Sequence, residues 1–182
     1  MKRTVLAVAL VALGVGASPA VPSPELPSGS LYREPLKWTS DSGAAVELAD
    51  FRGQTVVLSM FYSECSSVCL CTLGKLREIE KAFAQRGLSL QIVLVSFDSL
   101  HDTKQRLARF RHREELPVDR WHLLSGSPRN VSRLAQRIGL GSYVDAGEHI
   151  VHAYRIVLLD EEGLVSKTLD ANHNKVASLF DR

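Results

Sequence analysis

An apolar run that leads into a pair of cysteines is the most distinctive feature of the sequence. Residues 55–62 (Thr-Val-Val-Leu-Ser-Met-Phe-Tyr) have the composition of a buried β-strand, and the segment from Cys69 onward has helical spacing of its apolar residues. Cys65 and Cys69 therefore lie at a strand-to-helix junction. Open α/β sheets carry their chemistry at the carboxyl ends of their strands, so this junction is the candidate functional site.

The spacing of these two thiols is compatible with two chemical states. If the chain turns helical just after Cys65, positions four apart bring their Cβ atoms within roughly 5 to 6 Å, which suits one metal ion or, after a small adjustment, a disulfide. The amino end of a helix also favours the thiolate that metal ligation and thiol exchange both require. A purely structural disulfide is the competing interpretation, but so small a loop would stabilise the fold little.

The amino terminus is typical of a secretory signal peptide. Met1-Lys-Arg precedes an uncharged apolar run from Val5 to about Ala17, and the small residues that follow permit cleavage after Ala17 or Ala20. The run is shorter than the roughly 20 residues of a membrane-spanning helix, which favours cleavage over a retained anchor. We therefore expect a periplasmic protein that associates with the membrane only through a retained signal or through its client.

The rest of the chain has the length and composition of one soluble domain. After the signal peptide at 1–20, residues 21–34 are rich in proline and serine and are predicted to form a flexible spacer. Residues 35–182 then form the folded domain.

The charge balance argues against nucleic acid as a partner. The chain has 22 Lys and Arg residues against 20 Asp and Glu, and removal of Lys2 and Arg3 with the signal leaves 20 against 20. Export also places the cysteines in an oxidising compartment, where a disulfide can persist. Three cysteines leave at least one thiol unpaired.

The order of the remaining elements predicts an α/β, thioredoxin-like fold. Strands are predicted over residues 36–39, 45–48, 55–62, 90–97, 121–124, 153–159 and 164–167, and helices over 69 to about 86, 103 to about 113, 128 to about 137, and from about 175. The sequence of elements is βαβ, an inserted helix and an antiparallel ββα unit. It predicts a mixed central sheet flanked by helices, with an N-terminal β-hairpin.

Histidine is a natural third ligand for a metal that two thiolates already hold. His149 and His152 stand just before the strand at 153 and are expected near the cysteine end of the sheet. Residues three apart on an extended strand face opposite ways, so at most one of them can serve the site. His101, His112 and His122 are interpreted as solvated residues of loops or polar faces, because their neighbours are charged or polar.

Four separated blocks of the sequence share the pattern of a known family. They are Tyr62-Ser-Glu-Cys65-Ser-Ser-Val-Cys69 with Thr72, Leu73 and Leu76; Val95-Ser-Phe-Asp98 with Asp102 and Thr103; Trp121 to Gly126; and His152 ahead of Leu158 to Gly163. In this order the chain resembles, from about residue 36 to 180, the Sco/SenC family of copper chaperones for cytochrome c oxidase assembly.

The resemblance implies a site, a cofactor and a partner. It implies that Cys65, Cys69 and His152 bind one copper ion, as Cu(I) or Cu(II), on a thioredoxin fold. The implied partner is subunit II of cytochrome c oxidase, whose binuclear copper site would receive copper or have its cysteines reduced, or another copper or thiol client.

The sequence departs from the family pattern close to both thiols. Ser66 and Leu70 replace the prolines that usually follow the motif cysteines, and Ser99 replaces the proline after the strand-end aspartate. Cys71 adds a third thiol. It is either an accessory ligand or disulfide partner, or a spectator that packs as a small apolar residue.

Two aspartates follow the strand at 90–97 and have alternative interpretations. Asp98 either orients a metal ligand from the second coordination sphere or caps a turn. Asp102 is predicted to cap the next helix, with Gln105 three positions on completing a capping box.

Two functions from different classes follow from these residues. In a copper metallochaperone, reduced Cys65 and Cys69 hold the ion together with His152, and oxidation to the disulfide prevents binding. In a thiol-disulfide oxidoreductase, one thiolate attacks a partner's disulfide and the other resolves the mixed species, with no need for copper or His152. A peroxidase that uses one cysteine as its nucleophile is a third alternative.

Overall fold

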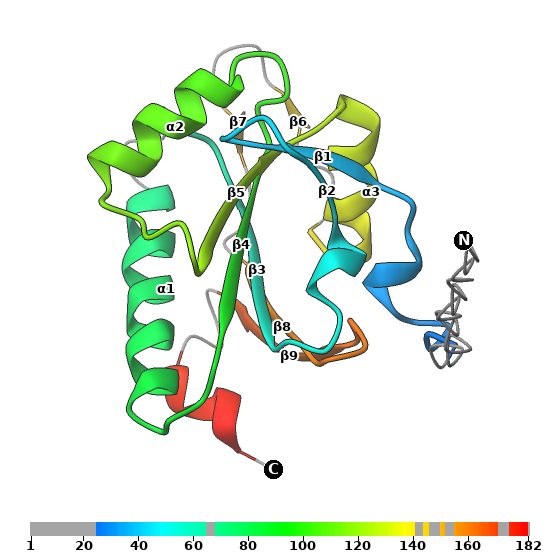
Figure 1. Cartoon of the computed structure of the whole chain (residues 1–182), viewed down its shortest axis with the longest axis vertical. Helices are drawn as coiled ribbons and strands as arrows, with labels where there is room; N and C mark the ends of the chain where they lie inside the picture. The colour runs from blue at the N-terminus through cyan, green and yellow to red at the C-terminus, as the bar shows by residue number, and fades with distance from the viewer. Residues whose placement is uncertain are drawn as a thin grey trace, which may run out of the picture.

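The computed structural model of the chain describes residues 25–64, 68–140, 144–145, 150–151, 155–170 and 175–181. Within these residues, one mixed sheet has the strand order β2-β1-β5-β4-β3-β8-β9 (Figure 1). Its strands are β1 (Lys37–Ser40), β2 (Ala45–Glu47), β3 (Val56–Phe61), β4 (Gln91–Ser96), β5 (Trp121–Ser125), β8 (Arg155–Leu159) and β9 (Val165–Asp170). The helices are α1 (Val68–Ala84), α2 (Lys104–Arg113) and α3 (Pro128–Arg137), with 3-10 turns η1 (Leu31–Arg33), η2 (Leu48–Phe51) and η3 (Val176–Phe180).

The central strands β3, β4 and β5 run parallel, whereas β8 and β9 on one side and β1 and β2 on the other pair antiparallel. This arrangement confirms the predicted mixed sheet and N-terminal hairpin. Parallel neighbours finish at the same edge of a sheet, so the carboxyl ends of β3 and β4 lie together.

The sheet is covered on both faces, and its strands divide their side chains between two cores. On β3, Val56, Leu58 and Met60 belong to one core with α3, and Val57 and Phe61 to the other with α1 and α2. Figure 1 shows α1 and α2 on one side of the sheet and α3 on the other. Burial on both faces explains the nearly continuous apolar composition of the central strands.

Helix α1 forms as its apolar spacing predicts. Leu73, Leu76, Ile79 and Phe83 recur every three or four positions and are all buried against the sheet. The turn that follows the helix contains Gly87, whose φ of +68° is strained for any residue with a Cβ atom. The helix therefore presents one continuous apolar stripe, and its amino end lies beyond the carboxyl end of β3.

The N-terminal segment corrects one expectation. The prediction of a flexible spacer over 21–34 is wrong for its described part, because Leu31 and Tyr32 are buried in the core and η1 begins at Leu31. The Leu31 amide also donates to the carbonyl of Gly163, at 2.9 Å. The proline- and serine-rich composition concealed these two anchors. The predicted signal peptide lies outside the described residues.

Two further segments differ in detail from the predicted elements. The final helix is a 3-10 turn, η3, and the stretch between the predicted helix that ends near 137 and the strand predicted from 153 contains β6 (Val144–Asp145). β6 pairs antiparallel with β7 (Ile150–Val151), separately from the main sheet. Within the residues that the structure describes, no helix combines the length and the apolar character needed to cross a bilayer.

His122 is less solvated than its sequence neighbours suggested. It lies on β5, half-buried, with Nε2 2.7 Å from Oε1 of Gln91 and its ring edge-on to Phe51 at a centroid distance of 4.8 Å. Burial lowers the pKa of His122 below its ordinary value, and the nearby Arg111 cation lowers it further.

Because of this lowered pKa, we expect protonation of His122 to make the free energy of unfolding depend on pH. The neutral His122 contributes to the free energy of unfolding in full above the unfolded-state pKa of about 6.5. This contribution is lost as pH falls through the lower folded-state pKa. The stability gap between the native chain and His122→Gln should therefore narrow from pH 7 to 5 in urea titrations. Parallel stability curves for the two proteins would contradict this.

Candidate metal centre

The described residues include only part of the predicted copper site. Cys65, His149 and His152 lie outside them, so the predicted ligand set stays a prediction. Cys69 is the second residue of α1, where its backbone is described and its side chain is not. No cluster of three or more His, Cys, Asp or Glu side chains suited to a metal ion occurs within the described part of the chain.

The edge of the sheet that leads to the thiols is well defined. Phe61, the last residue of β3, pairs with Ser96, the last residue of β4, and its carbonyl accepts a hydrogen bond from the Phe97 amide at 2.7 Å. The chain that leads into residues 65–71, which we call the thiol segment, and the chain that carries Asp98 therefore leave the sheet side by side.

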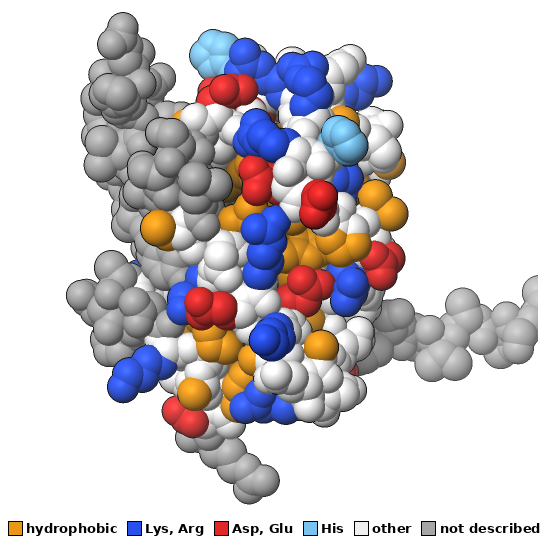
Figure 2. Space-filling view, turned by 90° about the vertical axis from the view of Figure 1, so that its left-hand side faces the viewer, with side chains coloured by type: hydrophobic (Ala, Val, Ile, Leu, Met, Phe, Trp, Pro, Cys, Tyr) orange, Lys and Arg blue, Asp and Glu red, His pale blue; other side chains and the backbone are white. Residues whose placement is uncertain are grey.

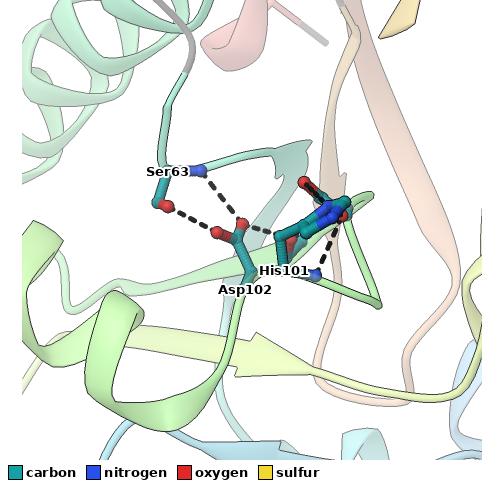
Figure 3. A network of polar contacts seen from close by, with 5 residues as sticks. Ser63, His101 and Asp102 are labelled. Atoms are coloured by element: carbon teal, nitrogen blue, oxygen red, sulfur yellow. Dashed lines mark hydrogen bonds and ion pairs between the residues drawn. The ribbon is translucent and has the colours of Figure 1, made fainter. Parts of the chain in front are cut away.

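Asp102 joins these two chain segments. Its carboxylate accepts the Ser63 amide N–H at 3.0 Å, the Ser63 hydroxyl, and the Ser96 hydroxyl at 2.5 Å (Figure 3). Asp102 is only 3 % exposed, so its carboxylate exchanges water for these three donors. The carboxylate therefore links Ser63, just after β3 and two residues before Cys65, to Ser96 at the end of β4.

This arrangement corrects the predicted role of Asp102 as a helix cap. The N-cap of α2 is Thr103, whose hydroxyl accepts the Arg106 amide at 3.3 Å, and the helix begins at Lys104. Asp102 and Thr103 are both capping residues by type, and the buried serines bind the aspartate instead. The sequence signal for this network is Ser96, a polar residue in an otherwise apolar strand that must find a buried partner.

The far end of α2 also contacts Ser63. Nη2 of Arg113 donates to the Ser63 carbonyl oxygen at 3.0 Å. The amide and hydroxyl of Ser63 are therefore bound by Asp102, just before α2, and its carbonyl by Arg113, the last residue of α2. The helix thus fixes the backbone from which the thiol segment departs.

Asp98 closes a turn with His101. Its Oδ1 accepts the His101 amide at 3.1 Å and lies 2.8 Å from the ring Nδ1 of the same residue. Figure 3 shows His101 beside the Asp102 network. The His101 side chain is 68 % exposed, which agrees with its interpretation as a solvated residue. The proposed second-sphere role of Asp98 remains a prediction, although the turn already engages its carboxylate.

Cys71 is exposed in the first turn of α1. By helical spacing it shares a side of the helix with Lys75 and Glu78, which form an ion pair at 2.5 Å. Cys71 therefore does not pack against the core, and the choice between an accessory thiol and a spectator stays a prediction. An exposed thiol two residues after Cys69 remains accessible to reagents and to partner thiols.

A comparison with protein-family models identifies the family. The SCO1/SenC model matches residues 25–180, which include all four blocks of the sequence pattern and the buried N-terminal turn. The chain belongs to the SCO1/SenC family. The match begins before the domain boundary expected from the sequence, in agreement with the burial of Leu31 and Tyr32. No curated protein sequence matches the chain.

Solved structures share the fold of this SCO1/SenC protein. Arabidopsis thaliana ScoI with copper bound is 24 % identical, with a TM-score of 0.69 over 80 % of this chain and 91 % of its own. A SCO1/SenC family lipoprotein from Bacillus anthracis str. Ames is 20 % identical, with a TM-score of 0.71 over 80 % and 89 %. BsSco, described as a cytochrome c oxidase assembly protein with a disulfide switch, is 19 % identical, with a TM-score of 0.71 over 82 % and 90 %. These likenesses confirm the predicted thioredoxin-like fold.

Proposed function

We propose that this protein is an exported copper carrier that serves cytochrome c oxidase assembly. The observation that carries the proposal is the family match over residues 25–180, which spans both motif cysteines and His152. The described geometry supports it, because the thiol segment leaves the sheet where β3 and β4 end together. A solved relative, Arabidopsis thaliana ScoI, has copper bound.

In this proposal Cys65 and Cys69 supply thiolates to one copper ion and His152 supplies a neutral imidazole. Soft thiolate ligands select Cu(I), and an imidazole completes a site from which ligand exchange can remove the ion. Copper is the cargo. It leaves when the thiols of a client replace those of the carrier, and oxidation of the carrier's pair to a disulfide would prevent loading.

The client and the compartment are part of the same proposal. The client is subunit II of cytochrome c oxidase or another protein with a copper or thiol site, and the carrier meets it in the periplasm after export. The apolar run that follows Met1-Lys-Arg supports export. Nucleic acid has no place in this function.

Thiol-disulfide exchange is the second candidate function. It is favoured by BsSco, which is described as having a disulfide switch. An oxidoreductase of this kind would reduce the cysteines of a client's copper site without holding copper itself. It requires Cys65 and Cys69 but not His152, so one histidine variant separates the two functions.

We expect His152→Ala to lower the Cu(I) affinity of the reduced protein by at least about tenfold, since even the loss of an outer-shell partner typically costs 10- to 100-fold. Competition with a chromophoric Cu(I) chelator measures the affinity. The Cu(II)-loaded native protein should also show a sulfur-to-copper charge-transfer band.

His149→Ala is the matched control, because this histidine lies three positions away on the same segment. It should retain native affinity. If His152→Ala binds copper as tightly as the native chain and still reduces a peptide disulfide, the oxidoreductase replaces the carrier as the function.

A further inference from the structure

Helix α2 carries an unusual concentration of positive charge. Its ten residues include five Lys and Arg residues, one His and no acidic residue, whereas the whole chain has 22 Lys and Arg against 20 Asp and Glu. Figure 2 shows Lys and Arg side chains gathered at the top of the face that α1 and α2 form. This excess of positive charge in α2 is not a property of the whole protein.

Three of these cations lie on one flank of the helix. Arg106, Arg109 and Arg113 follow the i, i+3, i+7 spacing that places side chains on one face, and we call them the arginine stripe. Arg109 and Arg113 are exposed and Arg106 is half-buried. Leu107 and Phe110, the buried residues of α2, turn toward the core instead.

The stripe is only partly neutralised within the protein. Arg113 lies 3.1 Å from Glu114, but Arg106 and Arg109 form no ion pair with any residue that the structure describes. Arg111, on the other flank, is bound to Asp41 through two nitrogens and is half-buried. Arg111 therefore has a structural partner, whereas the guanidinium groups of Arg106 and Arg109 have no ion-pair partner among the described residues.

The stripe also borders the segment that leads to the thiols. Arg113, its last member, donates to the Ser63 carbonyl, and Asp102, just before the helix, accepts from the Ser63 amide and hydroxyl. Ser63 precedes Cys65 by two residues. A protein that approaches the thiol pair would therefore meet this flank of α2.

We propose that the arginine stripe is a docking surface for an acidic patch beside the client's thiols. The inference rests on the proposed function and adds the chemistry by which the client is recognised. A protein patch fits better than a lipid surface, because interfacial helices insert apolar side chains and those of α2 are buried in the core. Arginine suits this role because its guanidinium binds carboxylates in two-point geometry.

The transfer that this docking serves is a balanced ligand exchange. Cu(I) leaves the two carrier thiolates, which take up two protons, and the His152 imidazole, which stays neutral. It binds two client thiols, which release two protons. No electron is exchanged. Docking changes how often the two thiol pairs meet and leaves the carrier's intrinsic affinity for copper unchanged.

Two synthetic peptides test the proposal. Both contain the same pair of cysteines four positions apart, and one is flanked by glutamates and the other by glutamines. At low salt we expect Cu(I) transfer from the native protein to be about tenfold faster to the glutamate peptide, as electrostatic steering predicts, and the difference should shrink at high salt. Arg106→Glu/Arg109→Glu should abolish the difference. A second measurement uses the copper-free protein and a fluorescent glutamate peptide without cysteines. The native protein should bind this peptide, as fluorescence anisotropy detects, and Arg106→Glu/Arg109→Glu should not.

Lys81→Glu/Arg129→Glu is the matched control, with the same charge change at exposed positions of α1 and α3. It should retain the preference for the glutamate peptide. Equal loss in both variants would show a net-charge effect and overturn the proposal. The proposal would also be overturned if the stripe variant kept its binding to the glutamate peptide and lost binding only to anionic vesicles. These vesicles contain roughly 30 mol % phosphatidylglycerol, which represents an anionic membrane surface. Native Cu(I) affinity in both variants would show that the copper site is intact, so failure of the docking surface is distinguishable from failure of the carrier function.

Discussion

Asp102→Ala is expected to lower the free energy of unfolding by about 3 kcal/mol. The substitution leaves three donors without their acceptor, two on Ser63 and one on Ser96, and an unsatisfied buried donor costs about 1–3 kcal/mol before relaxation and water entry reduce the sum. Urea titration of the reduced, metal-free protein measures the loss. An unchanged slope with a lower midpoint would identify a change in stability alone.

The same substitution should weaken copper binding, because it releases the backbone that leads to Cys65. We expect the Cu(I) affinity to fall by about 10- to 100-fold, as for the loss of an outer-shell partner in a metal site. Asp102→Asn retains an acceptor oxygen of the same reach and should recover most of both losses. A destabilised Asp102→Ala protein with native copper affinity would show that the network supports the fold and not the site.

Asp160 provides the matched control for Asp102. Its Oδ1 accepts the amides of Glu162 and Leu164 at 3.1 and 2.8 Å in the β8–β9 turn. Leu159 pairs with Val56, so this turn lies at the opposite end of β3 from Ser63. Asp160→Ala should cost about 1–2 kcal/mol of stability, as expected for lost turn hydrogen bonds, and leave copper affinity unchanged.

Cys69→Ser is expected to reduce Cu(I) affinity by more than about 100-fold, beyond the usual cost of losing an outer-shell partner. A serine hydroxyl stays protonated near neutral pH and is a hard donor, so it does not replace a thiolate at Cu(I). Competition with a chromophoric chelator under reducing conditions measures the affinity, and circular dichroism checks that α1 forms.

Cys71→Ser is the paired variant, since it makes the same atomic change two positions along the same helix. Its thiol is exposed in the structure, and we expect its loss to leave copper affinity within about threefold of the native value, below the effect of an outer-shell partner. An equal loss in both variants would make Cys71 a ligand and would change the proposed donor set.

The parts of the fold that local physics determines were predictable from the sequence. The apolar stripe of α1 follows from the spacing of Leu73, Leu76 and Phe83. Helix α3 begins at Pro128, as predicted, and Ser127 is its N-cap. The nearly continuous apolar run at 90–97 is typical of a strand buried on both faces, which β4 is. In each case residues within a few positions of one another carry the information.

Features that depend on distant residues were not predictable in this way. The role of Asp102 is set by Ser63, which is 39 residues earlier in the chain, and a capping rule sees only the nearest turn. The burial of Leu31 likewise depends on Gly163 in the β8–β9 turn. At the site, the sequence predicted the sheet edge correctly. Cys65 and Cys69 followed from their place at the strand-to-helix junction, whereas the choice of His152 came from the family resemblance, because spacing could not choose between His149 and His152.

The hydrogen bond from the Ser63 amide to Asp102 supplies an internal probe. This proton is buried, hydrogen-bonded to a carboxylate and outside the β-ladder, and its residue is two positions from Cys65 and outside the proposed ligand set. Its hydrogen–deuterium exchange rate and its NMR chemical shift report on the backbone just after β3. Comparing this amide between the apo, copper-loaded and disulfide forms would show whether a change at the thiols alters the structure at the end of the sheet.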